Sequence, residues 1–312
     1  MTWVVVSLIV LIALAGLIAW PVLRETALPR MDAGARREAE GDFAELSQGV
    51  THYQWIGPLR GPVAVCVHGM TTPSFVWRGL ARGLAGWGYR VLIYDLYGRG
   101  YSDRPRGAQD RAFFLTQLDD LLAHEGIEDD ITLFGYSMGG AIATAFAARA
   151  PDRVRRLILL APAGMGLQLD RATRIIRDVP GLGDWLMLAA YPRQFRRGTD
   201  AERDLPSSVT GIVDRQQAEL TYRGFVPSVL SSLRGILSED FEPDHRALRK
   251  GNVPVIAIWG RDDDVVPLTA MGKLTEWSRH ARQDVIDGAG HGLPYTHTAE
   301  VLAALRGTLT DD

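Results

Sequence analysis

A serine framed by glycines occupies the segment GYSMGG, residues 135–140. The apolar run before it has the β-branched and aromatic content of a buried strand, and the run of small residues after it is typical of a helix. Ser137 is therefore expected where a strand turns into a helix. Small neighbours permit a sharp turn there, and the first N–H groups of the helix face any anion that forms. This placement suits a serine that attacks a carbonyl carbon.

A nucleophilic serine needs a general base, and histidine is the usual one. Of the seven histidines, His291 lies in a glycine-rich loop that follows an apolar strand, where a scaffold presents functional side chains. His297 is the alternative. Three other histidines lie in polar or charged segments and are expected to be solvated: His124, His245 and His280. His52 is expected in an edge strand.

The group that holds such a histidine in the correct tautomer is usually a carboxylate. Three successive aspartates, residues 262–264, follow a buried-strand run that ends at Gly260. Neighbouring side chains in an extended loop point in different directions, so composition does not choose among them. The order along the chain is serine, then aspartate, then histidine, and this order is one of three known for the same catalytic groups.

The elements that must position these residues follow from the apolar runs. Six runs predict strands, near residues 62–67, 90–95, 131–135, 155–160, 253–259 and 282–286. The stretches between them predict helices, near residues 76–86, 110–125, 138–149, 268–279 and 298–307. This alternation predicts a mostly parallel central sheet flanked by helices. It is interrupted once, by almost ninety residues without a buried-strand run before the fifth strand, which indicates an insertion.

Four separated motifs give the chain a family resemblance. They are VHGM (67–70), YDLYGRGYSDRP (94–105), GYSMGG (135–140), and GRDDDVVP (260–267) followed by GAGHG (288–292). In this order and with these gaps the chain resembles the serine α/β-hydrolases, over roughly residues 43–309. The resemblance implies an α/β-hydrolase fold, with a helical cap inserted after the sixth core strand.

The resemblance also implies a role for each catalytic group. Ser137 would be the nucleophile, His291 the general base and Asp263 the acid that orients the histidine. Asp263 occupies the acid position of the family pattern G-x-x-D-x-x-x-P, which residues 260–267 match. The backbone N–H groups of Met70 and Met138 would stabilise the oxyanion.

Substrate contacts are expected from the cap and from the loop that carries Met70, HGMTTPS (68–74), which is called the oxyanion loop below. The residues predicted to make them are His68, Gly69, Trp77 and Trp185, and His68 is expected chiefly to shape its loop. Further apolar cap residues either face an apolar substrate or form the small core of the cap itself. These residues are Met187, Leu188, Tyr191, Phe195 and Phe225.

The composition fits one large domain with an insertion. The chain has 312 residues, of which 46% are hydrophobic, and a net charge of −3, which argues against a nucleic-acid partner. Its single cysteine, Cys66, lies in an apolar run and is expected in the core. The histidines and the cysteine show no metal-ligand spacing, and no G-x-G-x-x-G opens a helix after a strand. The sequence therefore predicts neither a metal nor a cofactor.

The N-terminus predicts a membrane span. Residues 3–23 carry no charge, and at about 1.5 Å per residue a helix of that length crosses a hydrocarbon core of roughly 30 Å. A cleaved signal peptide is the alternative, although no cation precedes the apolar run. The expected organisation is an anchor over 1–23, a linker over 24–42, a core over 43–162 and 251–312, and the cap over 163–250.

Arginines flank the predicted span on one side only. None precedes it, and four follow it in the linker, at positions 24, 30, 36 and 37. The positive-inside rule then predicts that the catalytic domain lies on the cytoplasmic side.

Three functions fit these features. The favoured one is a membrane-anchored esterase or lipase that acts on a lipophilic or monoacylglycerol-like ester, so the expected partners are a small-molecule ester or lipid and the bilayer. A carbon–carbon bond hydrolase of meta-cleavage products shares the fold and triad, but such enzymes often carry H-G-x-G-P-G where this chain has HGMTTPS. A non-catalytic ligand receptor is the third. Epoxide hydrolases and haloalkane dehalogenases normally have aspartate at the position of Ser137.

Overall fold

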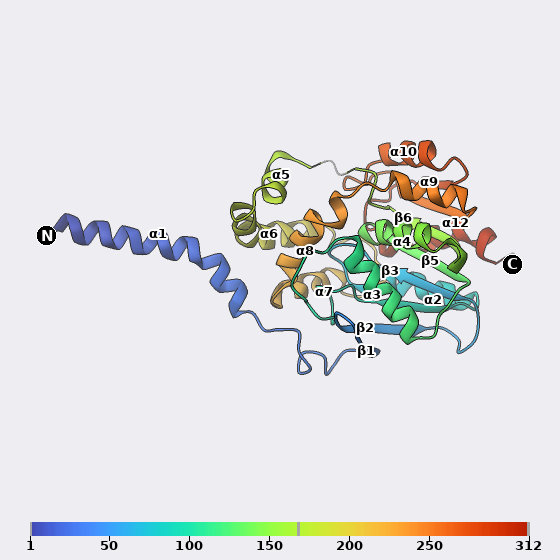
Figure 1. Ribbon diagram of the computed structural model, residues 1–312, viewed down its shortest axis with the longest axis horizontal. Coiled ribbons are helices and arrows are strands. Elements are labelled where there is room, and N and C mark those ends of the chain that lie inside the picture. Colours follow the sequence, from blue (N-terminus) through green and yellow to red (C-terminus); the bar gives the residue numbers. More distant parts are fainter. Residues whose placement is uncertain (1, 167–168, 311–312) are drawn as a thin grey trace.

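An eight-stranded sheet forms the centre of the molecule (Figure 1). The computed structural model describes residues 2–166 and 169–310. The strand order is β1-β2-β4-β3-β5-β6-β7-β8; β2 runs antiparallel to both of its neighbours, and the remaining neighbours pair in parallel. The strands are β1 Asp42–Leu46, β2 Gly49–Ile56, β3 Val63–Val67, β4 Arg90–Tyr94, β5 Ile131–Tyr136, β6 Val154–Leu160, β7 Val255–Gly260 and β8 Arg282–Ile286.

Helices cover both faces of the sheet, and each face has its own apolar core. One face packs against α3 (Arg111–His124), α4 (Met138–Arg149), α9 (Glu242–Lys250) and α10 (Thr269–Trp277). The other packs against α2 (Arg78–Gly86), α11 (Leu293–Thr296) and α12 (Thr298–Leu309). Strands β5 and β7 are buried along their whole length, as parallel strands covered on both faces must be. The predicted mostly parallel sheet flanked by helices is confirmed, and Cys66 is buried within it.

The antiparallel strands differ from the sequence prediction. The six predicted runs correspond to β3–β8, and no run was predicted for β1 or β2. His52 was expected on an edge strand, but β2 lies between β1 and β4, and His52 is only 3% exposed. The central residues of β2 include Thr51 and Gln54 as well as His52, all buried. Buried polar residues give no apolar alternation, so the sequence signal for this strand was weak.

Four helices lie between β6 and the helix α9. They are α5 (Arg171–Asp178), α6 (Leu182–Asp200), α7 (Ile212–Ala218) and α8 (Phe225–Arg234), with short 3₁₀ turns at Glu219–Thr221 and Ile236–Ser238. Three of them, α5, α6 and α8, share a small core of their own, whereas Ile212 and Val213 of α7 pack into the main core. Met187 and Phe225 belong to this small core, and three further predicted cap residues pack against it: Leu188, Tyr191 and Phe195. Helix α9, also inside the predicted 163–250 cap, packs instead against α4 in the main core.

His245 is buried and not solvated as expected. It lies on α9, is 1% exposed, and stacks on Trp277 of α10 with ring centroids 5.7 Å apart. Burial lowers the pKa of His245 to about 4, so the imidazole is neutral at pH 7. The segment EPDHRALRK is rich in charge, but the helix is amphipathic, and His245 shares its buried face with Leu248.

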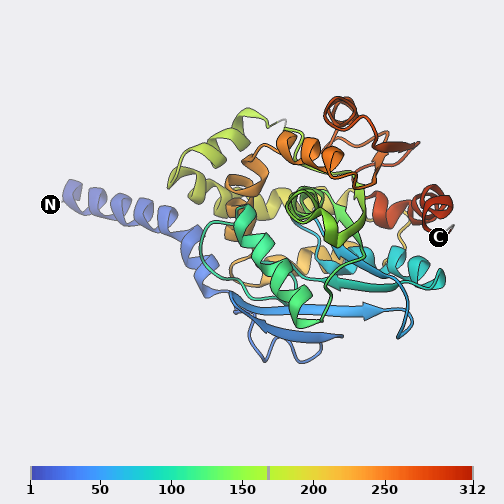
Figure 2. The same cartoon turned by 45° about the vertical axis from the view of Figure 1, so that its right-hand side comes forward.

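Helix α1 (Thr2–Ala27) projects from the body of the molecule in both views (Figures 1 and 2). Among the described residues it is the one helix long and apolar enough to cross a membrane, with a mean hydropathy of 2.7. It contains Pro21, which lacks a backbone donor, and Figure 1 shows it bending toward its C-terminal end. The helix continues four residues past the predicted span. Its end contacts the cap, where the Gly224 N–H donates to the Glu25 carboxylate at 2.6 Å.

Candidate active site

Ser137 joins β5 to α4 in a backbone conformation that non-glycine residues rarely adopt, with φ 52° and ψ −121°. Its carbonyl accepts a hydrogen bond from the Ala163 N–H at 2.9 Å, which ties the turn to the segment after β6. The flanking glycines are required for close approach. A Cβ on Gly139 would lie 2.1 Å from the Val67 carbonyl oxygen, and one on Gly135 would lie 2.5 Å from that of Gly139. The turn is therefore sharp because its neighbours lack side chains.

His291 and Asp263 form a hydrogen-bonded chain with Ser137. The Nε2 atom of His291 lies 3.0 Å from Ser137 Oγ, and its Nδ1 lies 2.8 Å from Oδ2 of Asp263. The other carboxylate oxygen of Asp263 accepts from the N–H groups of Val265 and Val266, both at 2.8 Å. The Asp263 side chain is fully buried, so both of its oxygens are held by protein donors.

The other residues considered as acid or base have different surroundings. Asp262 and Asp264 are both exposed, on either side of the buried Asp263. His297, the alternative base, is at the start of α12, where its Nδ1 lies 2.9 Å from Thr296 Oγ1. Of the three aspartates and two histidines weighed from the sequence, the structure brings Asp263 and His291 together with Ser137.

Tyr136 supports the histidine from the serine turn. Its hydroxyl donates to the His291 carbonyl at 3.0 Å, and the two rings lie 5.3 Å apart at 37°. Burial raises the pKa of the Tyr136 hydroxyl well above its usual value, so the group remains a donor. Sequence reasoning missed this residue, although it is the variable position between Gly135 and Ser137 in the motif.

The candidate oxyanion donors lie on two segments beside Ser137. Met138 is the first residue of α4, where N–H groups have no acceptor within the helix. Met70 follows Gly69 in the oxyanion loop, and a Cβ on Gly69 would lie 3.2 Å from Ser137 Cβ, so this loop passes directly beside the serine. Within the described part of the chain, neither the Met70 nor the Met138 N–H donates a hydrogen bond. Both are free to bind an anion.

His68 shapes the oxyanion loop. It is fully buried, accepts from the Leu96 N–H through Nε2 at 2.9 Å, and donates through Nδ1 to the Gly69 carbonyl at 2.7 Å. Burial lowers the pKa of His68 to about 4, which keeps the ring neutral. A side chain with no exposed surface does not contact substrate, so the substrate-binding role predicted for His68 is replaced by the loop-shaping one.

Arg99 is a fully buried cation that joins the oxyanion loop to the cap. Its Nε donates to the Met70 carbonyl at 2.8 Å, and its Nη2 donates to Ser232 Oγ at 2.8 Å and the Ser228 carbonyl at 3.3 Å, both on α8. Nη1 donates to Gln109 at 2.5 Å. Burial lowers the pKa of Arg99 to about 9, and the group remains charged at pH 7.

We expect Arg99→Met to lower kcat by roughly 100-fold, because the Met70 segment loses its buried donor and a shift of about 1 Å at a reacting centre has that cost. Arg99→Lys should recover part of the loss, since an ammonium group can still donate to the Met70 carbonyl. Steady-state kinetics measure kcat and thermal melting measures stability, so the two together distinguish loss of loop positioning from loss of folded protein. A lower melting temperature with unchanged kcat would contradict a positioning role.

Two predicted substrate contacts lie away from the serine. Trp77 is fully buried, and its ring meets Phe134 and Tyr136 edge-on, so it is a core residue. Trp185 lies on α6, where its Nε1 donates to the Ile18 carbonyl of α1 at 2.8 Å. Trp185 was predicted from its place in the cap and Trp77 from its place near the oxyanion loop, and the actual surroundings of both depend on packing between distant segments.

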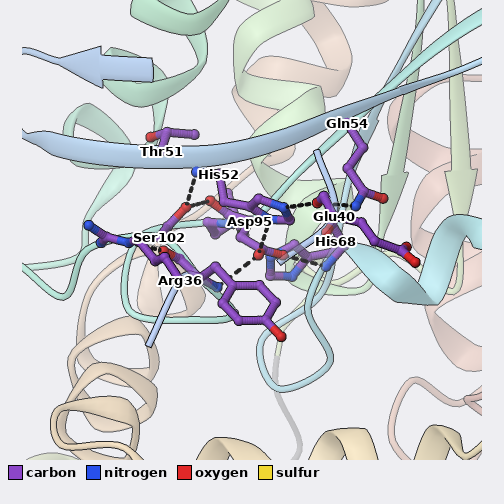
Figure 3. A network of polar contacts seen from close by, with 12 residues as sticks. Arg36, Glu40, Thr51, His52, Gln54, His68, Asp95 and Ser102 are labelled. Atoms are coloured by element: carbon purple, nitrogen blue, oxygen red, sulfur yellow. Dashed lines mark hydrogen bonds and ion pairs between the residues drawn. The ribbon is translucent and has the colours of Figure 1, made fainter. Parts of the chain in front are cut away.

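A second buried histidine–aspartate pair connects β2 to β4 (Figure 3). His52 Nδ1 lies 2.7 Å from Oδ2 of Asp95, and Asp95 also accepts from the N–H groups of Ser74 and Tyr101, both at 2.9 Å. Burial alone would raise the pKa of Asp95. The charge and hydrogen bond of His52, together with the bond from Ser74, outweigh burial and hold this pKa well below its usual range. Ser102 Oγ accepts from the His52 backbone N–H and does not contact the ring, so this pair is structural.

The loop that carries Asp263 also borders a small cavity. Its volume is about 240 Å³, and it is formed by segments 162–166 and 265–273, including the two residues that donate to Asp263. Within residues 2–166 and 169–310, no group of three or more histidine, cysteine or acidic side chains could hold a metal ion.

The family follows from comparison with known proteins. A family model described as the alpha/beta hydrolase fold matches residues 62–298, which include the serine turn, the aspartate loop and the histidine. The match covers most of the chain, and the protein belongs to the α/β-hydrolase fold family.

Relatives within the family differ in their reactions. The 2-hydroxymuconate semialdehyde hydrolase of Pseudomonas putida is 30% identical over 221 residues, covering 69% of this chain and 75% of that protein. Lipase 1 of Psychrobacter immobilis is 24% identical over 246 residues, covering 75% and 73%. A solved membrane phospholipase A, described as a bacterial virulence factor, shares 20% identity and a TM-score of 0.68 over 100% of both chains. This structural likeness shows the fold alone.

Proposed function

We propose that the protein is a membrane-anchored serine hydrolase that cleaves carboxylic esters. The hydrogen-bonded chain from Ser137 through His291 to Asp263, at a sharp strand-to-helix turn, carries the proposal. Two free N–H groups beside the serine suit the oxyanion of acyl transfer. The likeness to a lipase supports an ester as the substrate.

In the first half-reaction, Ser137 Oγ attacks the ester carbonyl carbon while His291 Nε2 accepts its proton. Asp263 holds the Nδ1–H of His291 and stabilises the resulting imidazolium. The N–H groups of Met70 and Met138 bind the oxyanion, and each such donor lowers the barrier by on the order of 3 kcal/mol. His291 then protonates the departing alkoxide, which leaves an acyl group on Ser137.

In the second half-reaction, water replaces the alcohol. His291 takes a proton from the water as its oxygen attacks the acyl carbon, and the same N–H groups bind the second oxyanion. His291 returns the proton to Ser137 as the carboxylic acid leaves. Protons and electrons balance with these groups and water alone, so neither step requires a metal or cofactor.

A lipophilic ester, such as a monoacylglycerol-like lipid, is the proposed substrate. Helix α1 would hold the catalytic domain at a membrane surface, where such esters concentrate. Helix α6 of the cap lies against α1, through the bond from Trp185 to Ile18. The four arginines that follow the span in the linker favour the cytoplasmic side for the catalytic domain.

Carbon–carbon bond hydrolysis is the second candidate. It is favoured by the 30% identity to the 2-hydroxymuconate semialdehyde hydrolase of Pseudomonas putida. The oxyanion loop HGMTTPS (68–74) lacks the glycines of H-G-x-G-P-G, which lowers this candidate relative to an esterase. A non-catalytic receptor ranks third, because it would leave the Ser137–His291 contact without a use.

A substrate panel separates the candidates. The full chain in detergent and a chain lacking residues 1–24 are assayed with p-nitrophenyl esters of increasing acyl length, monoacylglycerols and a meta-cleavage dienone. We expect both proteins to hydrolyse the esters and to leave the dienone intact, because the catalytic groups lie outside α1. Turnover of the dienone alone would overturn ester hydrolysis, and turnover of nothing would favour the receptor.

The anchor has its own test. We expect the full chain to stay with membranes after a carbonate wash, whereas a chain starting at Arg24 becomes largely soluble, because α1 supplies the uncharged span. Sedimentation followed by immunoblotting measures both. Recovery of a mature N-terminus near Gly16 would mean that the segment is a cleaved signal.

A further inference from the structure

A cavity that the proposed reaction does not use lies at the C-terminal end of α1. Its volume is about 710 Å³, it is open to solvent on one side, and it is lined by residues of α1, the linker, the segment 103–109 and α8. None of its lining residues belongs to the Ser137–His291–Asp263 chain. Four arginines line it, at positions 30, 104, 106 and 223.

Three of these arginines carry unpaired charge. Within the described part of the chain, the guanidinium groups of Arg30, Arg106 and Arg223 make no hydrogen bond or ion pair. Arg30 and Arg106 are exposed and Arg223 is half-buried. The Arg104 side chain is buried and forms an ion pair with Glu219 at 3.1 Å, so Arg104 lines the cavity while its charge is balanced.

The two carboxylates that line the cavity are already engaged. Asp103 pairs with Arg36 at 2.5 Å, and Glu25 accepts from the Gly224 N–H at 2.6 Å. Asp103 is balanced by Arg36, whereas Glu25 keeps its charge because its partner is a neutral N–H. Three unpaired arginines against one unpaired carboxylate leave the cavity with an excess of positive charge. Arginine guanidinium groups form paired hydrogen bonds to phosphate oxygens, so the ligand that suits this lining is a phosphate-bearing anion.

The position of the cavity, next to the end of α1, indicates that a membrane lipid carries that phosphate. Glu25 and Thr26, which line it, are separated from the apolar residues of α1 by Arg24 alone. When residues 3–23 fill the hydrocarbon layer, the cavity lies at the depth of the lipid headgroups. Basic pockets next to a membrane span recognise anionic headgroups, and a volume of this size is typical of small-molecule sites.

We propose that this cavity binds the headgroup of an anionic phospholipid from the membrane that α1 crosses. Arg106 and Arg223 contact the phosphate from the segment 103–109 and the start of α8, and Arg30 contacts it from the linker. The inference rests on the proposed anchoring and is independent of ester hydrolysis. An occupied site ties the linker and the cap to the membrane surface.

The test measures lipid binding without turnover. Full-length protein carrying Ser137→Ala is placed in dodecyl maltoside micelles with increasing mole fractions of phosphatidylglycerol or phosphatidylcholine, and thermal unfolding is followed. We expect phosphatidylglycerol to raise the melting temperature saturably, by roughly 5 °C, and phosphatidylcholine to leave it unchanged. An equal rise with both lipids would overturn recognition of an anionic headgroup.

Variants locate the site. Arg106→Gln and Arg223→Gln should each increase the phosphatidylglycerol fraction needed for half of the shift by roughly fivefold. Arg37→Gln is the matched control, because it removes one exposed arginine of the linker outside the cavity and should have no effect. Equal weakening by Arg37→Gln would show diffuse attraction to the surface and overturn the proposal.

Two further arms distinguish other sources of the signal. The same rise with millimolar inorganic phosphate and no lipid would assign the site to free phosphate and overturn a lipid headgroup. Wild-type protein covalently labelled at Ser137 by a fluorophosphonate should keep the shift, and its loss would place the lipid at the catalytic serine. Failure of the anchoring is seen separately, as release of the chain by carbonate. Failure of the proposed hydrolase function would be seen as absence of labelling at Ser137, and the melting shifts of the Ser137→Ala protein with lipid need no turnover.

Discussion

Ser137→Ala should lower kcat for ester hydrolysis by roughly 10⁶-fold, because the variant has no oxygen with which to form the acyl-enzyme. The hydrogen bond that the Ser137 hydroxyl makes in the folded chain is to His291 Nε2, at 3.0 Å. The strained turn is held by its backbone bonds and by the neighbouring glycines, which the substitution leaves in place. Folding should therefore be unaffected.

Kinetics on a p-nitrophenyl ester and labelling by a fluorophosphonate measure this effect. Wild-type protein should be labelled and Ser137→Ala should not. Ser47→Ala, at an exposed serine far along the chain, is the control and should keep both activity and labelling. Equal labelling of wild type and Ser137→Ala would contradict the assignment of the nucleophile.

Asp263→Asn should lower kcat by roughly 10⁴-fold. The carboxylate accepts the Nδ1–H of His291 at 2.8 Å, which leaves Nε2 free to accept the serine proton. An amide at this position can donate to Nδ1, which favours the tautomer whose Nε2 already carries a proton. Substrate binding should change little, because Asp263 is buried behind the histidine.

The adjacent aspartates provide matched controls for Asp263→Asn. Asp262→Asn and Asp264→Asn remove the same charge from exposed positions in the same loop, and each should cost less than about tenfold. Steady-state kinetics on the three single variants compare them directly. A larger loss at either neighbour than at Asp263 would show that the contact with His291 does not carry the effect.

The three groups of the candidate site could be found in the sequence because each has a local signal. Ser137 and His291 lie in short glycine-containing segments directly after an apolar run, and the family pattern singled out Asp263 among three equal side chains. The ends of parallel strands meet at one edge of a sheet, so such segments converge in space. The core strands also have a local signal. Strands β5 and β7 are buried along their whole length, and each appears in the sequence as an apolar run.

What the sequence did not predict depends on contacts between distant segments. Arg99 lies in the motif YDLYGRGYSDRP (94–105). Its partners are 29 residues away in the oxyanion loop and 129 and 133 residues away on α8. Trp77 and Trp185 were assigned to substrate because aromatic residues suit a pocket. Local patterning does not indicate which aromatic ring packs into a core, because that depends on contacts between segments far apart in the chain.

The two buried neutral histidines make the fold sensitive to acid. His68 and His245 have pKa values of about 4 in the folded protein, and unfolding returns each to water and to the ordinary value of 6.5. Their contribution to stability is fully present above pH 6.5. Between pH 6.5 and 4 the unfolded chain binds more protons, and each histidine lowers the free energy of unfolding by about 1.4 kcal/mol per pH unit.

Glu219 partly opposes this effect, because burial raises its pKa to about 7 and the folded state takes up its proton first. Among these three groups, the two histidines bind more protons on unfolding than the one carboxyl releases, so together they lower the free energy of unfolding in mild acid. One of the histidines supports the oxyanion loop and the other lies between α9 and α10. Acidification would therefore loosen the active-site loop and the helical layer over one face of the sheet together.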